Sequence, residues 1–385
     1  MLLVALAWPT PAHAYAWMIR HGYTQCGQCH VDPSGSGALT RYGHTIADSL
    51  LRTHYSFEHP TEDQQLGNFL FGAVELPDEL DFGGDLRVLS LHEKAEGAAR
   101  QDQLIWMQIE GKASIQAGRV VGSATLGYAP EGALGAAITG NPDKNLVSRE
   151  HWLGVWLGPD NQVLVRAGRM NLPFGVRSIE HTLWARVFTG TDIDDTQQYG
   201  LSASFATDRL RAEVMGIAGS LQLRPDVFRE RGYSAFAEYA VLPSLTFGAS
   251  SKIVHEELDP RLLREEWKQA HGVFGRWATP WEPLVLLSEW DYVLESPKYL
   301  LKTRGVVGYA QADIEATQGV HFMGTFEGSG VTVTSAPTSF GLWLSYAWFF
   351  APHADIRLDN VFRSIGTTSG HEGDLSFLIQ GHVSL

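Results

Sequence analysis

From about residue 83 to the C-terminus, apolar and polar residues alternate with a period of two, as in β-strands that have one wet and one dry face. In the last segment, Leu375 and Ile379 lie on one face. Asp374 and Gln380 lie on the opposite face. The alternation recurs segment after segment, so one side of the predicted sheet meets water and the other does not.

Sixteen such segments follow one another, and they begin near residues 83, 102, 119, 148, 162, 198, 209, 231, 244, 269, 282, 302, 316, 338, 353 and 374. Short turns are predicted at 158–161, 206–208, 242–243, 279–281 and 350–353, and long connections at 130–147, 170–197, 218–230, 255–268, 327–337 and 363–373. Alternating short turns and long loops, with an even strand number, are what an outer-membrane barrel requires. We therefore expect an all-β fold in which residues 83–385 form a 16-stranded transmembrane antiparallel β-barrel.

The competing fold is a soluble sandwich or propeller, because sixteen strands also make four propeller blades. No blade motif recurs in the sequence, which argues against the propeller. The composition of 40 glycines, 12 tryptophans, 12 tyrosines and 18 phenylalanines favours the barrel. The mean hydropathy of -0.10 fits a barrel with a polar lumen, because lipid-facing and water-facing residues cancel.

The first 14 residues are apolar and end in Ala12-His13-Ala14, which predicts a signal peptide and export. Residues 15–60 are short and loop-rich, with one helix expected over Thr45–Arg52. Residues 61–82 are a polar, acidic connector. Some 45 residues rarely form a sufficient core, so a cofactor or the barrel itself must stabilise the segment before the connector.

That segment contains Cys26-Gly27-Gln28-Cys29-His30, and C-x-x-C-H is the attachment signature of c-type haem. Two thiols at this spacing can form thioethers to one porphyrin, and the adjacent imidazole reaches the iron. We predict one haem c, with Cys26 and Cys29 as thioethers and His30 as the proximal iron ligand. The alternatives are a zinc half-site, which wants further soft ligands, and a redox dithiol, which usually accompanies a βαβ pattern.

A second axial ligand is needed if the haem only passes electrons. His21 is the first candidate because it lies close to the attachment motif, and Met18 is the weaker alternative. The remaining candidates are His44, His54 and His59 and, from the barrel wall, His321 and His382. Arg20 and Arg41 flank the segment and are predicted either to pair with the haem propionates or to form surface salt bridges.

The net charge of -14 argues against nucleic acid and leaves cationic solutes or a basic protein as partners. Two acidic clusters carry the oxygen ligands that attract divalent cations, and most such clusters are simply solvated loops. Their members are Asp192, Asp194 and Asp195, and Glu256, Glu257 and Asp259. The sequence contains no phosphate-binding glycine loop, H-E-x-x-H motif or nucleophile elbow.

With an export signal, a monohaem N-terminus and a barrel in one chain, the organisation resembles the outer-membrane monohaem cytochrome-porin fusions, which include the iron-oxidising cytochromes. The phrase RAGRMNLPFG at Arg166–Gly175 is similar to a strand-end phrase of many porin-type barrels. The resemblance implies electron transfer across the bacterial outer membrane. It leaves the electron donor open.

Three functions remain as hypotheses. In the first, a haem in the lumen or on the periplasmic side relays electrons between periplasmic carriers or multihaem cytochromes and an extracellular donor or acceptor such as a metal ion. In the second, the haem segment is the plug of a porin for small solutes, since sixteen strands can leave an aqueous channel. The third and weakest is a haem enzyme such as a peroxidase, which requires five-coordinate iron.

Overall fold

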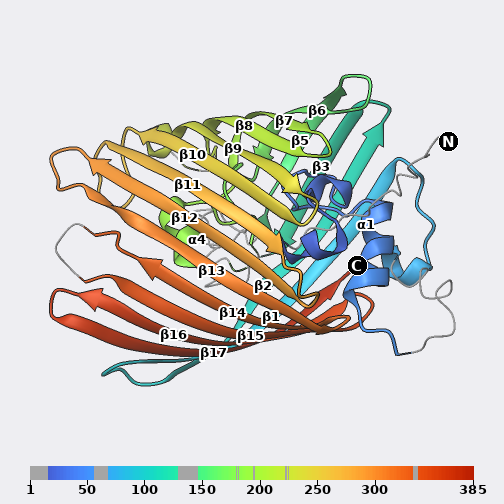
Figure 1. Cartoon of the computed structure of the whole chain (residues 1–385). Coiled ribbons are helices and arrows are strands. Elements are labelled where there is room, and N and C mark those ends of the chain that lie inside the picture. Colours follow the sequence, from blue (N-terminus) through green and yellow to red (C-terminus); the bar gives the residue numbers. More distant parts are fainter. Residues whose placement is uncertain are drawn as a thin grey trace, which may run out of the picture.

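The computed structural model describes residues 16–55, 68–128, 146–178, 180, 182–193, 196–221, 223, 225–332 and 337–385. Within them, each strand pairs antiparallel with the next along the chain, and β1 also pairs with β17, so the sheet closes into a barrel (Figure 1). The short strand β4 and the strand β5 both pair with β3 and form two parts of one barrel strand. The described part is therefore a closed 16-stranded antiparallel β-barrel.

The strands of the barrel are β1 Leu80–Ala95, β2 Gln101–Ala117, β3 Val120–Tyr128, β4 Leu146–Val147, β5 His151–Leu157, β6 Val163–Met170, β7 Gln198–Ala206, β8 Leu210–Gly219, β9 Arg231–Leu242, β10 Leu245–Glu256, β11 Glu266–Ala278, β12 Leu284–Pro297, β13 Thr303–Thr317, β14 Val320–Ser329, β15 Ser339–Ala351, β16 Ala354–Thr367 and β17 Gly370–Ser384. The helical segments are η1 Ala16–His21, η2 Cys26–Gln28, α1 Arg41–Ile46, η3 Ala47–Leu51, η4 Phe69–Gly72, α4 Trp184–Thr189 and η5 Asp226–Phe228. No helix in these ranges is both long and apolar enough to cross a membrane.

The period-two pattern located the strands well, because each predicted start lies within four residues of an observed one. The long connection predicted at 363–373 is wrong. Thr367 pairs with Gly370 across a tight turn, so β16 and β17 continue through that range. The stretch is rich in glycine, serine and threonine, which is typical of loops but equally fits the polar end of a hairpin. The helix predicted over 45–52 is present and begins earlier, at Arg41.

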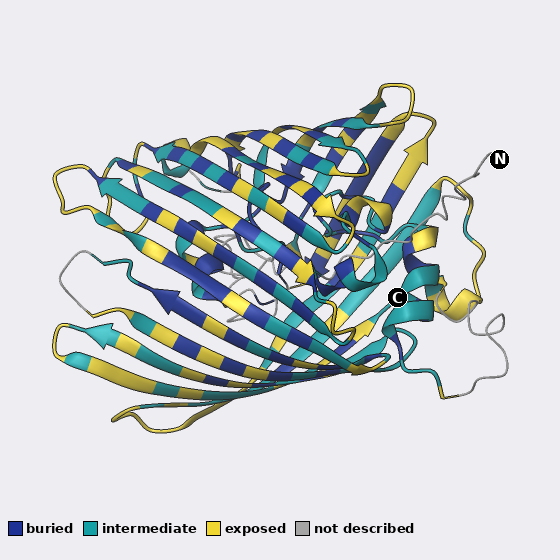
Figure 2. Cartoon of the chain, viewed as in Figure 1, coloured by how far each residue is buried: buried dark blue, intermediate teal, exposed yellow. Residues whose placement is uncertain are grey.

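Buried and exposed residues alternate along the strands (Figure 2). Many charged side chains are among the buried residues, and many large apolar side chains are among the exposed ones. On β12, Glu289 and Asp291 are fully buried inside. Their neighbours Trp290 and Tyr292 are 38% and 43% exposed on the outer surface. An apolar outside around a polar inside is the arrangement of a membrane-spanning barrel.

Val273 lies near the middle of β11 and is 63% exposed on the outer surface. We expect Val273→Arg to destabilise the barrel in lipid by about 2–4 kcal/mol, because the cation must lie in hydrocarbon. Reversible guanidinium unfolding in phospholipid vesicles measures this loss. Leu262→Arg, in the loop between β10 and β11, is the matched control and should change little. Equal losses in both variants would contradict a lipid-facing position for Val273.

Residues 16–55, here called the plug, lie at the end of the barrel that carries the short turns and the C-terminus (Figure 1). Arg20 donates to the carbonyl of Leu284 at 2.8 Å, and the Thr53 amide donates to the carbonyl of Phe349 at 2.8 Å. Both acceptors lie next to short turns. In outer-membrane barrels the short turns face the periplasm, so this is the periplasmic end in that orientation.

Apolar residues of η1 hold the plug against the inner wall. Met18 and Ile19 are essentially unexposed and pack with Val285 and Leu287 of β12. The ring of Trp17 contacts the ring of His321 in a tilted arrangement, with centroids 4.1 Å apart. A segment too short for its own core thus shares one with the barrel.

The segment 171–197 connects β6 to β7, and its described residues, here called the inner loop, fold into the barrel with α4 (Figure 1). The Val176 amide donates to Glu289 Oε2 at 2.7 Å, and the Trp184 amide donates to Glu327 Oε2 at 2.9 Å. Arg186 pairs with Glu289. The loop is therefore fixed across the lumen, above the plug.

The predicted signal peptide and residues 61–67 of the connector lie outside the described residues. The rest of the connector contains η4 and leads into β1 at Leu80, slightly before the predicted barrel start. Arg41 of the plug bonds to Asp78 and to the Leu76 carbonyl in this stretch.

Candidate functional site

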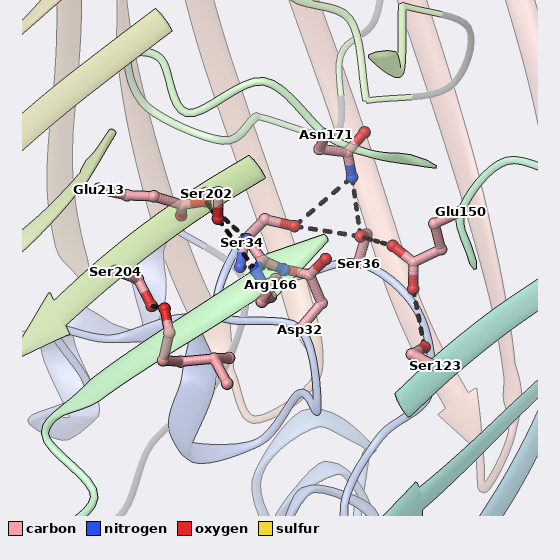
Figure 3. Close-up of polar contacts among 11 residues, drawn as sticks. Asp32, Ser34, Ser36, Ser123, Glu150, Arg166, Asn171, Ser202, Ser204 and Glu213 are labelled. Atoms are coloured by element: carbon pink, nitrogen blue, oxygen red, sulfur yellow. Dashed lines mark hydrogen bonds and ion pairs between the residues drawn. The ribbon is translucent and has the colours of Figure 1, made fainter. Parts of the chain in front are cut away.

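A buried ion triplet ties the plug to the barrel wall just after the cysteine motif (Figure 3). Arg166 of β6 lies 2.6 Å from Asp32 of the plug and 2.6 Å from Glu213 of β8. All three side chains are almost completely buried. Burial alone would raise the pKa of Asp32, but Arg166 and the Ser34 amide outweigh it and hold that pKa below its usual value. Asp32 is therefore a charged anchor of the plug.

A second polar network lies beside the triplet and also joins plug to wall (Figure 3). Ser36 donates to Glu150 Oε2 at 2.6 Å, and Ser123 of β3 donates to Glu150 Oε1 at 3.0 Å. Asn171, at the start of the inner loop, donates to Ser36 at 2.7 Å. Burial, followed by the nearby charge of Asp32, raises the pKa of Glu150 to about 7.

The raised pKa of Glu150 predicts a pH-dependent stability. Between about pH 4.5 and 7 the folded protein keeps a proton that the unfolded chain has already lost, so stability falls as pH rises through this window. We expect Glu150→Gln to lose this slope while other groups keep theirs. Guanidinium unfolding of both proteins at several pH values measures the difference. An identical pH profile in the variant would contradict the prediction.

The cysteine motif folds as one tight turn. The amides of Cys29 and His30 donate to the Cys26 carbonyl at 3.1 and 3.0 Å. Helix α1 packs on this turn so closely that a Cβ at Gly43 would lie 2.2 Å from the Cys29 carbonyl oxygen. Position 43 therefore accepts only glycine in this arrangement. Burial raises the pKa of the Cys29 thiol to about 12.

Cys29 and His30 line a cavity of about 230 Å³ at the end of the barrel that carries the short turns. His44 of α1, His353 of the β15–β16 turn and His382 of β17 line the same cavity. His30 Nδ1 is buried without a hydrogen-bond partner among the described residues. Burial and the charge of Lys112 lower the pKa of His30 to about 4, so its imidazole is neutral at pH 7, which is the form that binds metals.

The side chain of Cys26 contacts the barrel wall and not the cavity. The Cys26 thiol accepts a hydrogen bond from Arg211 Nη1 of β8 at 3.4 Å, and Cys26 does not line the cavity. The residues at the motif thus fit a c-type haem in part: one cysteine, the histidine and the cavity lie together. Cys26 would have to turn away from Arg211 to complete the attachment.

The structure does not bring the predicted distal ligands to the cavity. His21 Nε2 lies 3.2 Å from Glu315, and Met18 is buried against the wall. The predicted propionate partners are also elsewhere, because Arg20 bonds to backbone carbonyls and Arg41 pairs with Asp78. These four roles have no support from the geometry.

The remaining histidines divide between the cavity and other contacts. His54 lies 3.3 Å from the Ser49 carbonyl, and His321 lies 2.9 Å from Asp313, both away from the cavity. His59 falls outside the described residues. His353 was not among the ligand candidates predicted from the sequence. It lines the cavity because the tight β15–β16 turn, with a positive φ of 62° at His353, carries it there.

The acidic residues near the β10–β11 loop gather around a lysine. Glu256, Asp259 and Glu266 lie close enough to hold a metal ion. Lys268 forms ion pairs with each of them, at 3.0 Å to Asp259, and supplies the charge that a cation would bring. Glu257 pairs with Arg231 instead. In the other predicted cluster, Asp194 and Asp195 are outside the described residues.

Comparison with known proteins gives a structural likeness only. No family model and no curated protein matches the sequence. The fold is similar to the outer-membrane protein OmpT of Vibrio cholerae in its loop L8 deletion form, with a TM-score of 0.60 and 11% identity over 80% of this chain and 99% of that one. It is also similar to an anion-selective porin from Comamonas acidovorans, with a TM-score of 0.59 and 9% identity over 80% and 99% of the two chains.

A third similar structure is the outer-membrane channel DcaP of Acinetobacter baumannii, with a TM-score of 0.56 and 9% identity over 81% of this chain and 99% of that one. Identities this low establish the fold alone. The chain therefore has the fold of 16-stranded outer-membrane porins.

Proposed function

We propose that this chain is a porin-type barrel of the bacterial outer membrane in which the plug and the inner loop control what crosses. The observation that carries the proposal is the buried triplet of Asp32, Arg166 and Glu213, which fixes the plug inside the lumen. The porin fold favours this function, the second hypothesis from the sequence, over haem electron transfer. It also supports the outer membrane as the location.

About a fifth of the chain has no counterpart in these porins, which is close to the share that precedes β1. A barrel of porin type with an added plug explains both facts. The lumen wall carries both signs of charge, as at Arg357 and Asp359, so small charged solutes are the class that suits it.

Planar bilayers test the channel directly. We expect small ion conductance from the wild type and severalfold larger conductance after deletion of residues 16–55, because the deletion empties the periplasmic mouth. The conductance of a deletion variant that also carries the inner-loop substitution Arg186→Ala shows whether the inner loop restricts ion flow once the plug is gone. Unchanged conductance after the deletion would contradict control by the plug.

A second function, electron transfer, is favoured by the cysteine motif at the cavity. Cys29 and His30 line the same cavity, and the His30 imidazole is neutral at pH 7, the form that binds metals. In this role His30 would be the proximal iron ligand, and Cys26 and Cys29 the attachment points. Haem c, when bound, would supply one-electron cycling between Fe(II) and Fe(III).

The residues of the chain would then hold and orient the group. Helix α1, packed on Cys29 through Gly43, fixes the turn, and the triplet at Asp32 fixes the segment that follows His30. For a second ligand, His44 and His353 have the better position, because they line the cavity whereas His21 and Met18 do not. His382 is bonded on both ring nitrogens, to Asp85 and Asp355.

The partners proposed for this second function are periplasmic electron carriers or multihaem cytochromes on one side and an extracellular metal ion on the other. Expression in a host that matures c-type cytochromes tests the attachment. Mass spectrometry should find one haem on the peptide that contains Cys26 and Cys29. His30→Ala should keep the mass and change the iron spectrum. An unmodified peptide would contradict haem attachment, and the porin function would be the only one of the two that remains.

A further inference from the structure

The guanidinium of Arg177, in the inner loop, is buried and lacks a partner. Its three nitrogens are shielded from solvent and have no hydrogen-bond partner among the described residues. Its one recorded contact of another kind is with the ring of Phe236, 6.0 Å away. Other buried arginines of the lumen pair with carboxylates: Arg166, Arg186, Arg211, Arg276 and Arg357.

A second arginine lies in the same region and is only partly without partners. Arg87 of β1 has a buried Nε without a partner, and no ion pair of Arg87 is recorded within the described ranges. The nearby carboxylates Asp85 and Asp355 are already bonded to His382, and Asp85 also pairs with Lys112. These two carboxylates already have partners, so they do not serve as dedicated partners of Arg87.

Both arginines face the same space. Arg87 and Arg177 line the cavity that contains Cys29 and His30, and both also line a second, much smaller cavity farther along the lumen. They therefore stand where the two cavities meet.

An unpaired buried charge is costly, and arginine cannot escape the cost by losing its proton at neutral pH. Burial lowers the pKa of Arg177, while the charges of Glu213 and Asp32, both already paired with Arg166, act in the opposite direction, and the group stays cationic. The fold accepts this cost at Arg177, whereas Arg166, Arg186, Arg211, Arg276 and Arg357 are paired with carboxylates. An anion that binds there would remove it.

We propose that Arg87 and Arg177 form a carboxylate-binding site at the inner end of the periplasmic cavity. The planar guanidinium matches a carboxylate with two parallel hydrogen bonds, and two such groups suit a dicarboxylate. The proposal deepens the proposed function, because the carboxylates are either those of a small solute in the channel or the propionates of a haem held by His30. In the second case these arginines take the role that the sequence assigned to Arg20 and Arg41.

Succinate is the probe, and the full-length protein in detergent is titrated by calorimetry. A haem-free form is made with Cys26→Ala and Cys29→Ala. We expect succinate to bind this form, and to bind at least about tenfold more weakly after Arg177→Gln or Arg87→Gln, through loss of a charge-assisted hydrogen bond. Arg119→Gln, an exposed arginine at the same end of the barrel, should bind as the parent does.

The source of the carboxylate is read from the haem-bearing protein. If the propionates use the site, succinate no longer binds, and Arg177→Gln and Arg87→Gln lower the midpoint potential because a cation near the iron is lost. If the solute uses it, succinate binds both forms equally and the potential does not move.

Absence of succinate binding to the haem-free form, together with no shift in potential, would overturn the site. Folding is checked separately, because Arg177→Gln removes an unpaired buried charge and should unfold no earlier than the parent in guanidinium. The succinate titration does not depend on conductance or on haem attachment. Failure of the site is thus distinguishable from failure of either proposed function.

Discussion

Arg166→Leu should weaken the attachment of the plug to the barrel wall by about 3–5 kcal/mol, because it leaves Asp32 and Glu213 buried without their common cation. The plug should then leave the lumen more often. Limited trypsin digestion measures this, since Arg20, Arg41 and Arg52 supply cleavage sites within the plug. We expect much faster cleavage in the variant.

Two controls separate the loss of the ion triplet from a general loss of folding. Arg119→Gln removes an exposed arginine and should change stability by no more than about 0.5 kcal/mol. Arg166→Leu combined with Asp32→Asn and Glu213→Gln removes every charge of the triplet and should recover much of the loss. Cleavage at the wild-type rate in Arg166→Leu would show that the triplet does not hold the plug.

Glu289→Ala should loosen the inner loop by a similar amount, about 3–5 kcal/mol. Glu289 is fully buried, pairs with Arg186 and accepts the Val176 amide at 2.7 Å. Its removal leaves a buried guanidinium and a backbone amide without their partner. Hydrogen exchange of the loop amides measures the change, and we expect fast exchange from Val176 onward.

The matched control is Glu265→Gln, which removes a partly exposed carboxylate that pairs with Lys298 and His255 outside the inner loop, and should leave that loop unchanged. Adding Arg186→Ala to Glu289→Ala removes the guanidinium that Glu289→Ala leaves unpaired. It should therefore slow the hydrogen exchange of the loop amides again in part. Slow exchange in Glu289→Ala would mean that the loop is held by its other contacts, for example Trp184 with Glu327.

The barrel was predictable because its sequence signal, the alternation of apolar and polar residues, lies within each strand. Lipid outside and charge inside impose a period of two on every strand, so Trp290 and Glu289 reveal their opposite faces without any knowledge of their neighbours. The error at 363–373 has the same origin. A polar hairpin end has no apolar alternation to mark it, and its glycines and serines are typical of loops.

The site was predictable only where a motif carries it. Cys29 and His30 follow from five adjacent letters, and the structure places both at the cavity. The distal ligand and the propionate partners were sought near the motif in sequence, at His21 and Arg20. The cavity is instead completed by residues distant along the chain, such as Arg177 and His353, which closure of the barrel brings to the plug. Single-sequence patterns carry no signal for such long-range contacts.

The measurement that tests the central claim most directly uses sealed liposomes that carry the protein, an internal redox dye and a small entrapped solute, with an impermeant reductant outside. We expect the plug to govern both readouts. The solute should be held back by the wild type and released after deletion of residues 16–55. If the second function also holds, the dye responds in the wild type and stays silent in the variant with Cys26→Ala and Cys29→Ala. Solute release that is the same with and without the plug would contradict the claim, and a silent dye in the wild type would reduce the protein to a plugged porin.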